Sequence, residues 1–225
     1  MEATTEIQER PTLFALFDGL RERHRIQELL DTLEFRRALT QCLGLALGGA
    51  ALFGLWTGLY ALTLPQLLAS AIKAPLLLLG TTAICFPSFF VVQYVMSPRA
   101  LSLRAAALLQ ASTLAIIAVS WVVVALPCSL FLANSSNYRG AKVLVTLVAG
   151  FGGLIGMGWF ARGYRSASSS GEQAGSIRFL IPYMVLFGTV GAQLAWCLRP
   201  FLGSPSQGFS LFRPLGGNLF ESLLF

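Results

Sequence analysis

The chain has 225 residues, of which 55% are hydrophobic and only 12% are charged, and its Lys and Arg residues outnumber Asp and Glu by 16 to 10. Because an average soluble domain is about 25% charged, this composition excludes an ordinary soluble globular protein and is typical of a membrane protein. No basic stripe interleaved with aromatic residues accompanies the positive net charge, so we predict that nucleic acid is not a partner.

Residues 1–37 form a polar N-terminal segment. It carries two apolar stripes at helical spacing, namely Leu13, Leu16, Phe17 and Leu20, and then Ile26, Leu29, Leu30 and Leu33. Such stripes predict amphipathic helices that lie at the membrane interface, dock on a partner or pack on the protein's own membrane domain. The segment is too long for the n-region of a signal peptide, so we expect no cleaved signal.

Five apolar stretches follow, each close to or longer than the ~20 residues that cross a bilayer. They cover about 39–62, 75–96, 105–132, 141–161 and 179–198, within a membrane domain of residues 38–198. The expected fold class is therefore all-α: a polytopic membrane protein with five transmembrane helices, the N-terminal amphipathic segment and a short extramembrane C-terminal tail, residues 199–225.

Between the first two spans, the stretch from Leu64 to Lys73 is predicted to form a short separate helix at the membrane interface. Its apolar face would consist of Leu64, Leu67, Leu68, Ala71 and Ile72. Lys73 ends this stretch, and we expect its long side chain to extend to the interface.

Small residues spaced by four recur in three spans, and in lipid such residues let helices approach closely. The glycines concerned are Gly44, Gly48, Gly54 and Gly58 in the first span, Gly152, Gly153 and Gly156 in the fourth, and Gly188 and Gly191 in the fifth. We expect these three helices to touch, either each other or another subunit. Pro87 and Pro127 remove backbone donors from the second and third spans and are expected to kink them, which either gates a pathway or shapes packing.

The tail begins with Arg199, which ends the fifth span and is expected to anchor it at the headgroups together with Trp196. Pro200 stops the helix, and Phe201 is the first of several tail phenylalanines expected to pack on the bundle. Arg213 and Pro214 repeat the Arg-Pro pair and start a further turn, while Asn218 and Glu221 fit a capping box for a short helix over 219–225. Alternatively, Glu221 pairs with Arg213 or Arg199. We expect the tail to fold as an extracytoplasmic lid.

Lys and Arg residues are divided unequally between the loops on the two sides of the membrane. With the N-terminus inside, the inner side holds eleven of them and the outer side five. This asymmetry predicts an N-terminus inside and a C-terminus outside.

Apart from Lys142, the second residue of the fourth span, no Asp, Glu, Lys, Arg or His lies within the five predicted spans. Proton and cation pathways usually place ionisable residues there, so the pattern argues against a pump, a proton-coupled transporter and an intramembrane protease. The only histidine, His24, precedes every span, and the four cysteines form no C-x-x-C pair. We therefore predict buried free thiols, no catalytic site, no metal site and no cofactor beyond structural lipids. Gln93, Gln110 and Gln193 are expected to pair across helices.

Three stretches carry a resemblance to a known family: "IKAPLLLLGTTAICFPSFFVVQYVM", "SPRALSLRAAALL" and "GAQLAWCLRPFLGSPSQGFSLFRPLGGNLFE". Over residues 38–221 the chain resembles a family of small bacterial integral membrane proteins of unassigned function. The order of elements, a soluble N-terminal segment followed by five membrane helices, is similar to that of the Yip1 clan. The resemblance implies a location in the bacterial cytoplasmic (inner) membrane and brings no catalytic residue to this sequence.

These observations favour a non-catalytic accessory or scaffold subunit of a larger membrane protein complex, with membrane lipids and other membrane subunits as partners. Two alternatives stay open at this point. The first is a homo-oligomeric passive channel or small-solute transporter, with kinked helices and a neutral polar lining. The second is a membrane-organising adaptor, as the topology of the Yip1 clan implies.

Overall fold

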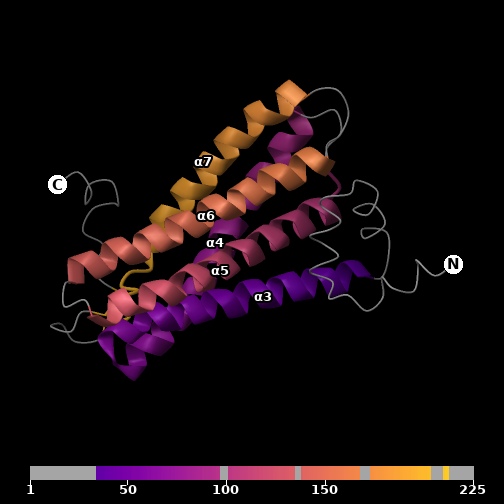
Figure 1. Ribbon diagram of the computed structural model, residues 1–225. Coiled ribbons are helices and arrows are strands. Elements are labelled where there is room, and N and C mark those ends of the chain that lie inside the picture. The colour runs from indigo at the N-terminus through magenta and orange to yellow at the C-terminus, as the bar shows by residue number, and fades with distance from the viewer. Residues whose placement is uncertain (1–33, 97–100, 135–137, 168–172, 204–209, 213–225) are drawn as a thin grey trace.

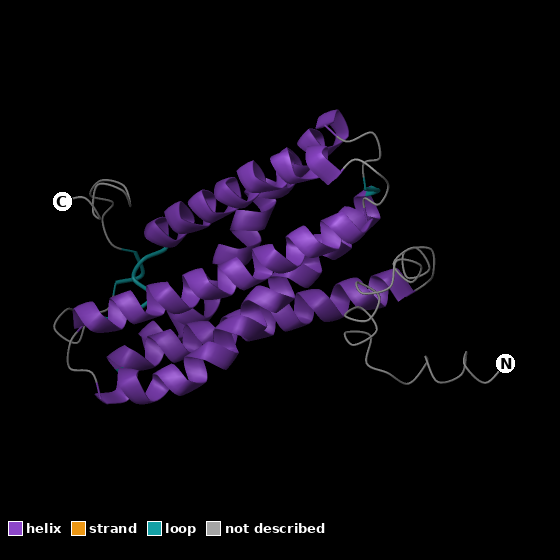
Figure 2. Ribbon diagram, turned by 45° about the horizontal axis from the view of Figure 1, so that its top comes forward, coloured by secondary structure: helices purple, strands orange, loops and turns teal. Residues whose placement is uncertain are grey.

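Five long helices run side by side in the computed structural model, which describes residues 34–96, 101–134, 138–167, 173–203 and 210–212 (Figure 1). They are α3 (Glu34–Gly58), α4 (Leu64–Met96), α5 (Leu103–Asn134), α6 (Tyr138–Ala167) and α7 (Gln173–Cys197), with a short 3-10 helix, η2 (Leu59–Ala61), after α3. Loops and turns join them, and the described residues contain no strand (Figure 2). Nearly all of the predicted N-terminal segment and the predicted helix over 219–225 lie outside the described residues.

Each long helix contains a stretch that is long and apolar enough to cross a membrane: Phe35–Ala61, Leu64–Met96, Leu103–Ser129, Tyr138–Arg165 and Leu180–Cys197. Inside a bilayer no water is available to the backbone, so an apolar segment satisfies its own N–H and C=O groups by forming a helix. The predicted all-α fold with five membrane-spanning helices is confirmed.

The predicted separate interfacial helix is wrong. α4 is continuous from Leu64 to Met96, so the second span begins eleven residues earlier than the sequence indicated and contains Pro75 and Pro87. At 1.5 Å per residue its 33 residues are about 50 Å long, well beyond a hydrocarbon core of about 30 Å. α4 accordingly crosses the bundle obliquely, from beside the end of α3 to beside α7 (Figure 1).

α5 lies between α3 and α6 (Figure 1) and packs on both through small residues. On the α3 side, a methyl group added to Gly49 would lie 3.1 Å from Cβ of Ala118. On the α6 side, Trp121 donates a hydrogen bond of 3.0 Å from Nε1 to the carbonyl oxygen of Ala149. The first and fourth spans therefore both pack on the third, which lies between them, and the fourth and fifth spans also contact each other.

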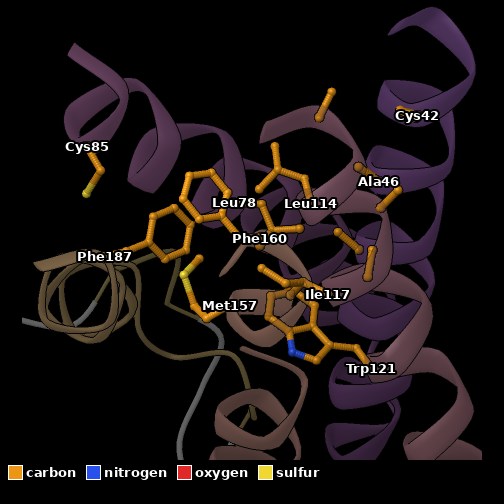
Figure 3. Close-up of a cluster of buried hydrophobic side chains, with 14 of the residues drawn as sticks. Cys42, Ala46, Leu78, Cys85, Leu114, Ile117, Trp121, Met157, Phe160 and Phe187 are labelled. Carbon is orange, nitrogen blue, oxygen red and sulfur yellow. The ribbon is translucent and has the colours of Figure 1, made fainter. Parts of the chain in front are cut away.

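α4, α6 and α7 meet through large aromatic side chains. Phe89 of α4 is completely buried, and its ring centroid lies 5.1 Å from that of Phe160, 5.8 Å from that of Tyr164 and 5.0 Å from that of Tyr183. Figure 3 shows part of this region, with Phe160 of α6 beside Phe187 of α7. Rings at these distances interact favourably beyond the area they bury. The aromatic cluster of Phe89, Phe160, Tyr164, Tyr183 and Phe187 therefore joins α4, α6 and α7.

Neutral polar groups add a hydrogen-bonded chain across three helices. The hydroxyl of Tyr183 in α7 donates to Oε1 of Gln110 in α5 over 3.1 Å, and Nε2 of Gln110 donates to Oγ1 of Thr82 in α4 over 3.5 Å. The expected pairing of Gln110 across helices is confirmed. Gln93 instead exchanges two hydrogen bonds with the backbone of Leu101, in the segment before α5.

Replacing Gln110 by leucine is expected to destabilise the protein by about 1–3 kcal/mol, because it removes the acceptor of a buried hydroxyl. Tyr183→Phe removes the donor instead and is expected to cost about 1 kcal/mol. Thermal unfolding of the purified protein in detergent measures both. In the Tyr183→Phe background Gln110→Leu should cost less than it does alone, and strictly additive effects would contradict the pairing.

The prolines and cysteines that the sequence places in the spans are all part of the helices. α4 and α5 continue as helix through Pro87 and Pro127. All four cysteines are free thiols, but the predicted burial holds only for Cys42 and Cys85, since Cys128 and Cys197 are half-buried.

Candidate functional site: a buried polar face on α4

The first turns of α4 place three polar side chains in the interior of the protein. Gln66, Ser70 and Lys73 are spaced by four and three residues, so they share one face of the helix. Their exposed fractions are only 2%, 0% and 3%. Leu64, Leu68 and Ile72, on the other side, are exposed. This part of α4 therefore buries its polar face and turns apolar residues outward, as a helix surrounded by lipid does.

The partners of this polar face come from the far end of the chain. α7 ends at Cys197, and Pro200 cannot continue a helix because it lacks a backbone N–H. The carbonyl groups that follow have no helical partner and need donors elsewhere. We call the described residues 200–203 and 210–212 the strap, since they lie against α4.

All three side chains donate hydrogen bonds to main-chain carbonyls of the strap. Gln66 Nε2 donates to the oxygens of Pro200 and Phe201 over 3.2 Å and 3.1 Å. Ser70 Oγ donates to Phe201 O over 2.6 Å. Lys73 Nζ donates to Pro200 O over 3.1 Å and also to Leu211 O. In these contacts α4 supplies the donors and the backbone of the strap supplies the acceptors, and Ser70 Oγ also accepts a hydrogen bond of 3.1 Å from Gln66 Nε2.

The ammonium group of Lys73 is buried, so its positive charge must be stabilised by the groups around it. Its Nζ lies 5.0 Å from the ring centroid of Phe212, within the range of a cation–π interaction. Among the described residues the only acid is Glu34, at the start of α3 and at the opposite end of the bundle (Figure 1). Desolvation of an ammonium costs several kcal/mol, and each hydrogen bond from a charged group offsets about 1.5–3 kcal/mol of it. Carbonyl dipoles and one ring face are the described groups that stabilise this charge.

The structure adds two facts about Lys73. Its side chain is buried, and its ammonium group binds backbone carbonyls of the strap at this end of the bundle. The stretch Leu64–Met96, which is long and apolar enough to cross a membrane, also includes Lys73, an ionisable residue that lies outside the shorter span 75–96 predicted from the sequence.

Close packing of α4 on α3 positions the polar face. A methyl group added to Gly54 would overlap the carbonyl group of Ser70 and lie 2.8 Å from Cα of Ala71. A methyl group added to Gly58 would lie 2.8 Å from Cα of Leu67. Only glycine leaves room for this backbone contact. Gly54 and Gly58 therefore place the first turns of α4 directly beside the end of α3.

The other glycines singled out by their spacing divide into two groups. Those at contacts are Gly152 and Gly156, which lie against Trp121 and Ile117 of α5, and Gly191, whose added methyl group would lie 3.6 Å from Thr81 of α4. Those with nothing within 4 Å of an added methyl group are Gly44, Gly48, Gly153 and Gly188.

The strap also contacts other helix ends. A methyl group added to Gly203 would meet Cβ of Ala61 and lie 2.9 Å from Cγ of Gln66, and the hydroxyl of Tyr138, at the start of α6, donates to Leu202 O over 3.5 Å. Before the strap, the guanidinium carbon of Arg199 lies 3.5 Å from the ring centroid of Trp196, a cation–π contact. The strap thereby connects η2, α4, α6 and α7 at one end of the bundle.

The sequence indicated the residues of the tail that accept hydrogen bonds at this site, but not the residues of α4 that donate them. It singled out Arg199, Pro200 and Phe201 in the tail, and the carbonyls of the last two are acceptors. Arg213, Pro214, Asn218 and Glu221 lie outside the described residues. The donors on α4 were missed, although their spacing by four and three residues is a visible signal for one polar helical face. In the described part of the chain, no three His, Cys, Asp or Glu residues gather as metal ligands would.

No protein-family model, curated protein or solved structure matches the chain. Its character therefore follows from its own features, namely five helices that are long and apolar enough to cross a membrane, with apolar side chains on their outer surface. The chain is a polytopic integral membrane protein.

Proposed function

We propose that the protein is a non-catalytic accessory or scaffold subunit of a larger membrane protein complex, and that α3 provides a surface for a partner helix. The observation that carries this proposal is the exposure of Gly44 and Gly48. Both are exposed, and an added methyl group at either would meet no atom of the described residues within 4 Å.

Gly44 and Gly48 lie on the face of α3 that is turned away from α5. Cys42, Ala46 and Ala50 are buried on the other face. Two positions along a helix correspond to about 200° around it, so each exposed glycine lies opposite a buried residue. Because the two glycines are four residues apart, they form one small-residue surface.

Contact with lipid does not explain why positions 44 and 48 are glycine. A glycine inside a helix costs about 1 kcal/mol relative to alanine, and contact with lipid tails does not offset that cost. A second helix does, because small residues allow close backbone packing and strong van der Waals contact. The same helix uses Gly54 in this way against α4. A partner helix on Gly44 and Gly48 extends this packing along α3.

The polar face of α4 supports the non-catalytic part of the proposal. The three donors are engaged by backbone carbonyls of the strap, which is the arrangement of a structural contact. Membership of the small bacterial family and a place in the bacterial inner membrane are part of the same proposal and rest on the stretches quoted above. Kinship with the Yip1 clan rests on topology.

The proposed orientation, with the N-terminus inside, rests on the eleven Lys and Arg residues of that side against five on the other. The start of α3 and the end of α7 lie at opposite ends of the bundle (Figure 1), which supports a position of these two helix ends on opposite sides of the membrane.

The test compares the full-length protein with the double variant Gly44→Leu/Gly48→Leu after extraction in a mild detergent. We expect the unmodified protein to elute as a complex with at least one other protein. The amount of this partner that elutes with the double variant should be lower by at least about tenfold. Leu147→Phe/Leu154→Phe is the matched control, because it adds bulk at two exposed positions of α6. The control should keep the partner, and the double variant, measured as the isolated chain, should be at least as stable as the unmodified protein because leucine is the better helix former.

Two outcomes would overturn the proposal. Elution of the unmodified protein as a stable monomer would remove the need for a partner surface, and retention of the partner by the double variant would place the contact elsewhere. A complex containing only this chain would instead favour the homo-oligomeric channel, which ion and solute flux into liposomes would then test.

A further inference from the structure

We propose that the end of α6 binds the headgroup of an anionic phospholipid through Arg162 and Arg165, and that the acyl chains of this lipid lie along the exposed apolar surface of the same helix. The site is on a different helix from the partner surface proposed on α3 and does not depend on it. It gives the protein a preference for one class of lipid at one end of the bundle.

Arg162 and Arg165 continue a stripe of exposed residues along α6. Leu147, Phe151 and Leu154 are large apolar residues of this stripe, and all five side chains are exposed. At 3.6 residues per turn, the five positions lie within an arc of about 80° around the helix axis. One narrow face of α6 is therefore apolar along its length and positively charged at its end.

The spacing along this face matches the dimensions of a phospholipid. Leu154 and Phe151 precede Arg162 by distances of about 12 Å and about 17 Å along the axis, at 1.5 Å per residue. The hydrocarbon of one leaflet is about 15 Å deep, which is half of the ~30 Å core. Gly158, one turn before Arg162, leaves the surface between them uncovered, because an added methyl group would meet no described atom within 4 Å. A lipid with its phosphate at Arg162 can therefore place its chains against the apolar part of the stripe.

The two arginines select an anion. Positions three apart on a helix are neighbours, and a guanidinium group offers several N–H donors in a geometry that fits phosphate oxygens. The helices α4 to α7 contain no Asp or Glu, so no carboxylate of these helices neutralises Arg162 and Arg165. In a zwitterionic lipid the cation of the headgroup offsets the phosphate charge, whereas an anionic lipid keeps it. Charge complementarity therefore favours the anionic lipid.

A second pair of arginines provides the means to distinguish a site from diffuse positive charge. Arg36 and Arg37 are exposed near the start of α3, at the same end of the bundle as the end of α6 (Figure 1). Arg37 precedes Gly44 and Gly48 by seven and eleven residues, so it shares a face with glycines and not with a stripe of large apolar side chains. Removal of this pair changes the charge of this end equally without touching α6.

The test measures lipid binding by the full-length protein in a mild detergent. Phosphatidylglycerol and phosphatidylcholine with the same acyl chains are added in separate titrations, and native mass spectrometry measures the fraction of protein that retains one lipid. We expect the protein to retain phosphatidylglycerol at least about tenfold more than phosphatidylcholine. Arg162→Gln/Arg165→Gln should lower this ratio by at least about fivefold, whereas Arg36→Gln/Arg37→Gln should leave it within about twofold of the unmodified protein.

Two features keep the comparison free of effects on folding. All four substituted side chains are exposed, and unchanged elution and melting temperature without added lipid show that each variant is folded. The ratio of the two lipids is also taken within each variant, so a difference in stability between variants does not enter it.

Three results would overturn the lipid site. Equal retention of the two lipids by the unmodified protein would show that it does not select an anionic headgroup. Equal loss of the preference in both double variants would show that only the total charge of this end matters. Displacement of phosphatidylglycerol by an equal concentration of glycerol phosphate, which has no acyl chains, would show an anion site that makes no use of the apolar stripe.

Discussion

Replacing Phe89 by alanine is expected to destabilise the protein by about 3–5 kcal/mol, the range for loss of a large aromatic side chain from a packed core. Phe89 is completely buried, and its ring contacts rings of both α6 and α7. In lipid the helices are held together mainly by such packing, because apolar surface has an equally apolar alternative in the lipid tails. The cavity left by the ring therefore weakens the joint between three helices at once.

Thermal unfolding of the purified protein in detergent measures this effect. Phe151→Ala is the matched control, because Phe151 is exposed on the outer face of α6 and loses contacts mainly with lipid or detergent. It should change the free energy of unfolding by about 0.5 kcal/mol or less. Equal losses for the two variants would contradict a central role of Phe89 in the aromatic cluster.

Replacing Gly54 by alanine is expected to destabilise the protein by about 2–3 kcal/mol, toward the upper end for overpacking in a core. The added methyl group would overlap the Ser70 carbonyl and lie 2.8 Å from Cα of Ala71. Both neighbours are backbone atoms, so no rotation of a side chain relieves the overlap, and α4 must move away from α3. This displacement would also carry Ser70 away from the strap.

Gly44→Ala is the matched control, because it adds the same methyl group to the same helix at a position where no described atom lies within 4 Å of it. In a detergent that isolates the single chain, it should raise the stability by about 0.5–1 kcal/mol, because alanine is the better helix former. The two variants are therefore expected to change the melting temperature in opposite directions. Two shifts of the same sign would show that Gly54 does not define the crossing of α3 and α4.

The five spans follow from the sequence because membrane insertion is decided locally. A run of about 20 apolar residues has a helix as its only stable form in lipid, whatever lies around it. The predicted third span, 105–132, became α5 (Leu103–Asn134), and the predicted fifth, 179–198, became α7 (Gln173–Cys197). The all-α, five-span fold needed no tertiary information.

The glycine motifs show where local reasoning ends. Gly44 and Gly48 have the same spacing as Gly54 and Gly58, and by sequence the two pairs are equivalent. Among the helices that the structure describes, only the second pair lies against a neighbour, because α4 runs beside the end of α3 and then crosses toward α7 (Figure 1). The path of a neighbouring helix decides which small residues make a contact.

The start of α4 is the element whose environment the sequence could not predict. An amphipathic stretch with Gln66, Ser70 and Lys73 on one face is typical of an interfacial helix, because a polar face ordinarily meets water. Here it meets the carbonyls of residues more than 120 positions later in the chain. By itself the sequence determined which segments are helices, which residues share a face and which backbone lacks helical partners after Pro200. Only the tertiary structure decided that these donors and acceptors satisfy each other, because a buried hydrogen bond depends on two distant segments meeting and no local pattern records that distance.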